Sequence, residues 1–277
     1  MIGQCNLQSR IEQLIKNHTF PRFSILVGPK GSGKKTFAKW VANQFQKNEI
    51  ATYFMCPDIK VDTIRDIING AYKIAGTNIY IIPDADNMSN AARNALLKVT
   101  EEPPNNAYFI MTLEDENNTL ETIRSRGTVF HMDRYTPDEI FEYYWTVGEM
   151  PNDAELVREI CETPGEVKRC IEMCSGTIQT FYDYVRLVVD NIADVSLANA
   201  FKIPSKVALK EDADGYDLRL FWKAFMKICL QDNVVYGIKA EAVQITSKYL
   251  QKLRVKGINR QMLIDCWLME IRELWQN

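Results

Sequence analysis

Short apolar runs alternate with amphipathic segments over the first half of the chain. Five runs are typical of buried strands, at residues 23–27, 52–55, 79–82, 108–111 and 128–132. Between them, apolar residues at three- and four-residue spacing predict helices over residues 34–46, 61–75 and 89–101. Strands that alternate with crossover helices form parallel sheets, and continuous apolar strands indicate burial on both faces. The pattern therefore predicts an α/β domain with a parallel sheet of about five strands.

Helix signals replace the strand pattern after residue 135. Thr136 precedes Pro137, which is the order expected for an N-cap and the first helical position, and Pro164 opens another helix. From residue 177 onward the helical segments lengthen and carry aromatic positions. Three parts are predicted: an α/β domain over residues 1–133, a small helical unit over 134–176, and an all-α domain over 177–277.

The composition is that of an ordinary soluble globular protein. Of the 277 residues, 46% are hydrophobic and 25% are charged, with a formal net charge of -3. That charge argues against nucleic-acid binding through overall charge, although a local basic surface stays open. Seven cysteines without a signal-peptide pattern indicate reduced thiols in a cytoplasmic protein. The longest apolar runs fall far below the roughly 20 residues that span a bilayer, so no membrane association is predicted.

A glycine-rich segment with the pattern of a phosphate loop follows the first strand. Residues 28–36 read GPKGSGKKT, which fits G-x-x-x-x-G-K. In such loops glycines let backbone N–H groups point at phosphates, the next helix adds its positive end, and Lys binds the β- and γ-phosphates. The candidate nucleotide-binding residues are Gly28, Gly31, Ser32, Gly33, Lys34, Lys35 and Thr36. A glycine-rich turn that binds no nucleotide is the alternative interpretation.

Both magnesium anchors of a working ATPase are missing from the sequence. The Ser or Thr expected after Lys34 is Lys35, and Thr36 comes one helical position later, rotated by roughly 100°. At the end of the third apolar run, Pro83 stands where a metal-linked Asp is expected and Asp84 where a catalytic Glu is expected. No metal site is predicted, and no nucleotide is required, although binding of ATP or ADP stays open.

Three further motifs follow in a fixed order and point to a family. They are NALLK at residues 94–98, EEPP at 101–104 and IRSR at 123–126. Together with the glycine loop, they resemble the AAA+ subunits of sliding-clamp loaders, most closely the bacterial delta-prime subunits of the DNA polymerase III loader. The resemblance covers residue 2 to about residue 175, and the last third matches only in being helical. It implies an AAA+ domain, a helical lid and a collar through which subunits form a hetero-oligomeric ring.

The resemblance assigns roles to particular residues. Arg126 matches the arginine finger of the family's S-R-C motif, with Gly127 in place of the Cys, and such a residue acts on a neighbouring subunit's ATP. Lys168 matches the sensor-2 arginine of the lid. The helix over residues 89–101 is implied to follow duplex DNA, which makes Arg93, Asn94 and Lys98 candidate phosphate contacts. No zinc is predicted, because only Cys56 lies where related subunits carry four cysteines.

The function implied is that of an ATPase-deficient subunit of a clamp loader in DNA replication. Its partners are then the other loader subunits, the sliding clamp and primer–template DNA. Two alternatives stay open: a working ATPase subunit that tolerates Lys35 and Pro83, and a stand-alone AAA+ adaptor without a clamp. A surface arginine without a role is likewise the alternative for Arg126, and a solvated helix face is the alternative for the three DNA candidates.

Overall fold

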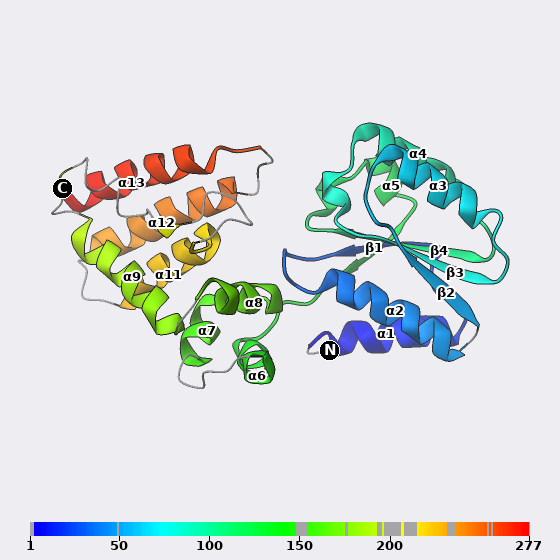
Figure 1. The fold of residues 1–277 in the computed structure, drawn as a ribbon, viewed down its shortest axis with the longest axis horizontal. Coiled ribbons are helices and arrows are strands. Elements are labelled where there is room, and N and C mark those ends of the chain that lie inside the picture. The colour runs from blue at the N-terminus through cyan, green and yellow to red at the C-terminus, as the bar shows by residue number, and fades with distance from the viewer. Residues whose placement is uncertain are drawn as a thin grey trace. The chain divides into compact units, whose positions relative to one another are not determined.

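The chain divides into two compact units, Met1–Tyr135 and Thr136–Asn277 (Figure 1). The computed structural model describes residues 3–48, 50–147, 154–174, 177–192, 196, 206–207, 215–231, 236–253, 255 and 257–276. The first unit ends close to the boundary expected at residue 133. The further division expected at residue 176 falls at 175–176, outside the described residues, and stays a prediction.

The first unit is built on a sheet of five parallel strands in the order β2-β3-β4-β1-β5 (Figure 1). The strands are β1 (Phe23–Val27), β2 (Ala51–Met55), β3 (Thr77–Ile82), β4 (Ala107–Leu113) and β5 (Thr128–His131). Each strand overlaps the apolar run that predicted it. The predicted parallel α/β fold is therefore confirmed.

Helices cover both faces of this sheet (Figure 1). One face carries α1 (Cys5–Lys16) and α2 (Lys34–Asn48), and the other carries α3 (Val61–Ala71), α4 (Asn90–Glu101) and α5 (Glu121–Arg124). Two short 3-10 turns, η1 (Ala85–Asn87) and η2 (Glu116–Asn118), follow β3 and β4. Helix α3 ends before the predicted residue 75, and the bond from Lys73 N to Gly70 O, three residues back, tightens its last turn.

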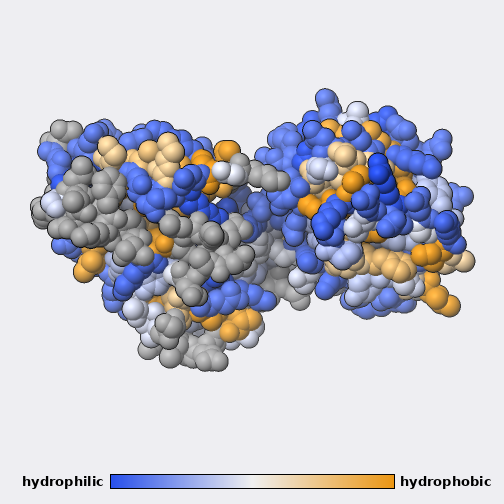
Figure 2. Space-filling model, turned by 45° about the horizontal axis from the view of Figure 1, so that its top comes forward, coloured by the Kyte–Doolittle hydropathy of each residue, from blue (hydrophilic) through white to orange (hydrophobic). Residues whose placement is uncertain are grey.

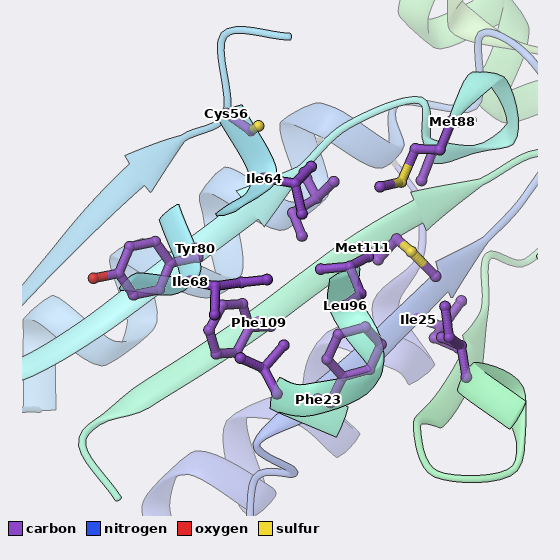
Figure 3. Close-up of a cluster of buried hydrophobic side chains, with 14 of the residues drawn as sticks. Phe23, Ile25, Cys56, Ile64, Ile68, Tyr80, Met88, Leu96, Phe109 and Met111 are labelled. Carbon is purple, nitrogen blue, oxygen red and sulfur yellow. The ribbon is translucent and has the colours of Figure 1, made fainter. Parts of the chain in front are cut away.

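Alternate residues of each central strand enter two different cores. In β4, Phe109 and Met111 belong to the cluster that includes Leu96 of α4 (Figure 3). Tyr108 and Ile110 of the same strand pack instead with α1 and α2. Because both faces are buried, the strands appear in the sequence as continuous apolar runs.

The second unit is helical. Its helices are α6 (Pro137–Val147), α7 (Ala154–Ile160), α8 (Pro164–Met173), α9 (Ile178–Asn191), α11 (Leu218–Gln231), α12 (Tyr236–Lys252) and α13 (Arg260–Gln276). The hydroxyl of Thr136 accepts a hydrogen bond from Glu139 N at 3.2 Å, which is the cap that the sequence predicted for α6. Between α11 and α13, the buried ring of Trp267 packs against the rings of Trp222 and Phe225.

Hydrophilic side chains dominate the surface in the view of Figure 2, and hydrophobic ones form smaller patches between them. Among the helices that the structure describes, none is long and apolar enough to cross a membrane.

Candidate functional site: the phosphate loop and the opposite edge of the sheet

The glycine-rich loop leaves β1 and enters α2 in a tightly packed turn. A Cβ atom on Gly28 would lie 2.9 Å from both Met132 Cβ and Ser32 Oγ, so a larger residue does not fit without movement. Gly31 and Gly33 have φ angles of 81° and 85°, in the left-handed region that favours glycine. The geometry of the loop itself therefore requires these glycines, whether or not a nucleotide binds.

Lys34 directs its ammonium group at its own loop. Its Nζ donates to the carbonyl oxygens of Gly28 at 2.8 Å and Pro29 at 2.9 Å, and the residue is only 7% exposed. Lys35 and Thr36 are exposed on the first turn of α2. The predicted phosphate ligand thus forms hydrogen bonds within the loop, and the residue after it faces solvent.

Charged groups of both signs act on the ammonium group of Lys34. Burial lowers the pKa of Lys34, and the negative charges of Glu114, Asp86 and Asp84 act in the opposite direction. The positive charge of Lys30 adds a smaller contribution that lowers the pKa further.

The end of β3 carries Pro83, which has no carboxylate, where a metal-linked Asp is expected. Pro83 is buried there, and Asp84 follows in the left-handed region with φ 51° and ψ 41°. The backbone N–H of Asp84 donates to the hydroxyl of Thr112 at 3.0 Å. Thr112 is fully buried in β4, so this hydroxyl connects β4 to the end of β3.

Asp86 joins three segments at the same edge of the sheet. Its carboxylate accepts hydrogen bonds from Glu114 N at 2.8 Å, Asp115 N at 3.3 Å and Asn118 Nδ2 at 2.9 Å. Its backbone carbonyl accepts from Arg93 Nη2 at 3.0 Å. No sequence motif indicates this role of Asp86, because its partners lie on separate segments that only the fold brings together.

Neither a metal cluster nor a reactive thiol is found at the candidate positions. No group of three or more His, Cys, Asp or Glu residues within the described ranges could hold a metal ion. Cys56 is buried, its Sγ donates to Asp58 O at 2.7 Å, and burial raises the pKa of this thiol to about 11. The environment of Cys56 is that of a packed core residue.

The three DNA-contact candidates on α4 do not share one environment. Asn94 and Lys98 are exposed and, four residues apart, lie on one face of the helix. The Lys98 Nζ lies 5.1 Å from the ring centroid of Tyr72. Arg93 is half-buried and points toward η1, where it donates to Asp86. An open face thus carries two of the candidates, and the third has partners within the domain.

Arg126 lies between α5 and β5 and is partly exposed. Its Nη1 donates to Thr122 O at 2.9 Å, and its Nη2 lies 3.1 Å from Glu101 Oε1. The side chain of Arg126 is 38% exposed and that of Glu101 is 53% exposed. A Cβ on the neighbouring Gly127 would lie 3.0 Å from the side chain of Phe23, so a larger residue there requires the strand side chains to shift.

Arg126 and the phosphate loop lie at opposite edges of the sheet. In the parallel pair β1–β5, Ser24 is opposite Thr128 and Val27 is opposite His131. The loop follows the carboxyl end of β1, whereas Arg126 precedes the amino end of β5. With a rise of ~3.3 Å per residue, the strand places roughly 20 Å between them. The phosphate loop and Arg126 are therefore two separate sites within the first unit. Lys168, the sensor-2 candidate, is exposed on α8 in the second unit.

The fold and the loop define the class of protein. The RuvB Holliday junction branch migration motor of Thermotoga maritima superposes with a TM-score of 0.51 at 18% identity, over 96% of this chain and 88% of that one. That likeness supports the fold alone. Together with the glycine loop and the helical second unit, it confirms the expected AAA+ fold.

The relatives found by sequence include subunits of DNA polymerase III. Residues 47–136 match the family described as DNA polymerase III, delta subunit. The DNA polymerase III subunit delta' of Haemophilus influenzae is 35% identical over 91 residues, 32% of this chain and 27% of that protein. The DNA polymerase III subunit gamma of Buchnera aphidicola is 28% identical over 145 residues, 43% of this chain and 40% of that protein. These matches span less than half of either relative, and they confirm the resemblance to clamp-loader subunits, most closely delta-prime.

Proposed function

We propose that this chain is a delta-prime-like subunit of a sliding-clamp loader in DNA replication. It does not hydrolyse ATP itself, and it completes the ATP site of a neighbouring subunit with Arg126. Its partners are the other loader subunits, the sliding clamp and primer–template DNA. The similarity to DNA polymerase III subunits supports the class of function.

The location of Arg126 carries the proposal. The residue is exposed and stands at the edge of the sheet away from its own phosphate loop, so it cannot contact a nucleotide bound there. A guanidinium on the surface suits a nucleotide held by another subunit, because its planar fork binds phosphate oxygens through two hydrogen bonds. Its effect is greatest when charge develops on the transferring phosphoryl group.

Two features of the phosphate loop support the absence of turnover. Lys35 supplies no hydroxyl to a magnesium ion, and Pro83 supplies no carboxylate. The backbone N–H groups of the loop and the N-terminus of α2 still suit an anion, so weak binding of a nucleotide without hydrolysis agrees with the proposal.

The test uses the loader assembled from this chain and its companion subunits, with ATP turnover measured in the presence of primed DNA. Arg126→Ala is expected to lower turnover at least about tenfold, since trans-acting arginines contribute up to ~10³–10⁵ in rate. Arg126→Lys restores little, because a point charge replaces the fork. Arg124→Ala is the matched control, because it removes an arginine two residues away, at the end of α5, whose Nη1 donates to Asn117 Oδ1.

Size-exclusion chromatography has to show that every variant assembles equally well. Equal turnover with wild-type and Arg126→Ala protein would remove the trans-acting role. Magnesium-dependent turnover by the isolated chain, lost in Lys34→Ala, would instead favour a working ATPase subunit.

A further inference from the structure

The guanidinium of Arg126 is bound to groups of its own domain. Its Nη2 forms an ion pair with Glu101 Oε1 at 3.1 Å, and its Nη1 donates to the carbonyl oxygen of Thr122 at 2.9 Å. A carboxylate and a phosphate compete for the same N–H groups of a guanidinium, since both bind these groups through paired oxygens. While the ion pair with Glu101 persists, Arg126 is held in one orientation and fewer of its N–H groups can turn to a nucleotide phosphate.

We propose that Glu101 is a positioning residue that restrains Arg126 in a resting orientation. Arg126 leaves Glu101 when it engages the nucleotide of a neighbouring subunit. This inference rests on the proposed function of Arg126 as an arginine finger, and it adds the residue that controls when the finger is available.

The backbone around the two residues suits this division of roles. Glu101 is the last residue of α4, directly after the buried Val99 and Thr100, so the core holds its backbone in place. Arg126 lies on a short connection between α5 and β5. Because Glu101 is fixed on a packed helix and Arg126 lies on a connecting segment, the side chain of Arg126 can move away while Glu101 keeps its position.

The exposure of the pair suits a reversible restraint. With side chains 38% and 53% exposed, the ions are partly solvated and their attraction is weak. A buried pair would be costly to separate, because each charge would lose its compensation in a medium of low polarity. The observed pair biases the orientation of Arg126 and still yields to a competing phosphate.

The test compares Glu101→Gln with wild type in the assembled loader with ATP and primed DNA. Gln keeps the shape of the side chain and removes its charge, so kcat/KM for ATP is expected to rise about two- to fivefold. Glu102→Gln is the matched control, because Glu102 is the next residue, is exposed and contributes its backbone carbonyl to Tyr72 Oη. This control is expected to behave as wild type.

Two further measurements separate restraint from a general structural effect. In an Arg126→Ala background, Glu101→Gln is expected to change nothing, whereas a structural role of Glu101 would persist. In the presence of Arg126, the gain is expected to shrink as salt rises, because added ions screen exposed charges. A gain that persists in the Arg126→Ala background, or that is independent of salt, would overturn the inference.

The outcomes also separate this inference from the proposed function. If Arg126→Ala leaves turnover unchanged, the arginine finger is wrong and the restraint is overturned with it. If Arg126→Ala lowers turnover while Glu101→Gln equals wild type or lowers it too, the finger stands and only the restraint is overturned.

Discussion

The charged side chains at the two edges of the sheet in the first unit differ in their burial and in their hydrogen-bond partners. At the carboxyl edge, Lys34 is buried and donates to carbonyl groups of its own loop, and Asp86 accepts from a backbone N–H after β4. At the amino edge, Arg126 and Glu101 form an exposed pair. The residues of the carboxyl edge stabilise the domain, whereas those of the amino edge stay accessible to another molecule.

The glycines of the phosphate-loop pattern have a structural cause that is independent of any nucleotide. The phosphate-loop pattern is satisfied here by close packing at Gly28 and by positive φ angles at Gly31 and Gly33. The geometry of the turn accordingly requires these glycines by itself. The residue proposed to act on ATP lies outside that motif, at the other end of the strands.

The largest effect on the stability of the carboxyl edge is expected for Gly28→Ala. The new methyl group would meet Met132 and Ser32 at 2.9 Å. Overpacking of this kind costs about 1–3 kcal/mol in the free energy of unfolding, which denaturant titration measures. Gly70→Ala is the control, because a Cβ there has its nearest neighbour at 3.8 Å and alanine favours a helix. Equal stability of the two variants would refute the tight packing of the loop.

Asp86→Ala is expected to have the next largest effect on stability. It removes a charged acceptor from the N–H groups of Glu114 and Asp115 and from the amide of Asn118. The expected loss is about 1–2 kcal/mol, at the lower end for bonds to a charged group because the site is half-exposed. Asp66→Ala, an exposed carboxylate on α3, is the matched control. A loss no larger than that of the control would show that Asp86 does not hold the loops together.

A smaller effect is expected on DNA binding when the open face of α4 changes charge. Lys98→Glu replaces a candidate phosphate contact with an anion, and it is expected to weaken binding of primed DNA by the assembled loader about three- to tenfold at low salt. The difference should diminish as the salt concentration rises. Lys47→Glu makes the same change on α2, which covers the other face of the sheet. Unchanged binding by the Lys98 variant at several salt concentrations would remove α4 from the proposed DNA surface.

The smallest effect concerns the dependence of stability on pH. Burial lowers the pKa of Lys34 below its ordinary value of 10.5. Between the lowered pKa and 10.5 the unfolded chain binds more protons than the folded one, so this residue makes stability rise with pH across that window. Wild type is therefore expected to gain stability relative to Lys34→Met as the pH rises from the lowered pKa toward 10.5.

Thermal unfolding across that pH range measures the gain. Lys39→Met, at an exposed position of α2, is the control and should show no such trend relative to wild type. A constant difference between wild type and Lys34→Met would mean that Lys34 titrates normally.

The strands of the first unit could be predicted because burial on both faces leaves an unbroken apolar run in the sequence. Helix α1 was missed, although its buried residues Leu7, Ile11 and Ile15 recur every four positions. The end of α3 was misjudged because the turn at Gly70 depends on backbone bonds that composition does not reveal.

The candidate site could be predicted only in its local parts. The glycine loop is continuous in sequence, so its pattern identified it directly. The carboxylates near Lys34 and the Glu101–Arg126 pair join residues of separate elements, and their proximity depends on the order of strands in the sheet. Residue types alone do not reveal such contacts.

The most direct test of the difference between the two edges compares one variant from each edge in the same assembled loader. DNA-stimulated ATP turnover is measured with Lys34→Met and with Arg126→Ala, after equal assembly has been established. Turnover with Lys34→Met is expected to stay within about twofold of wild type, and turnover with Arg126→Ala is expected to fall at least about tenfold. A large loss with Lys34→Met and normal turnover with Arg126→Ala would contradict the proposal that this subunit acts on ATP only through its neighbour.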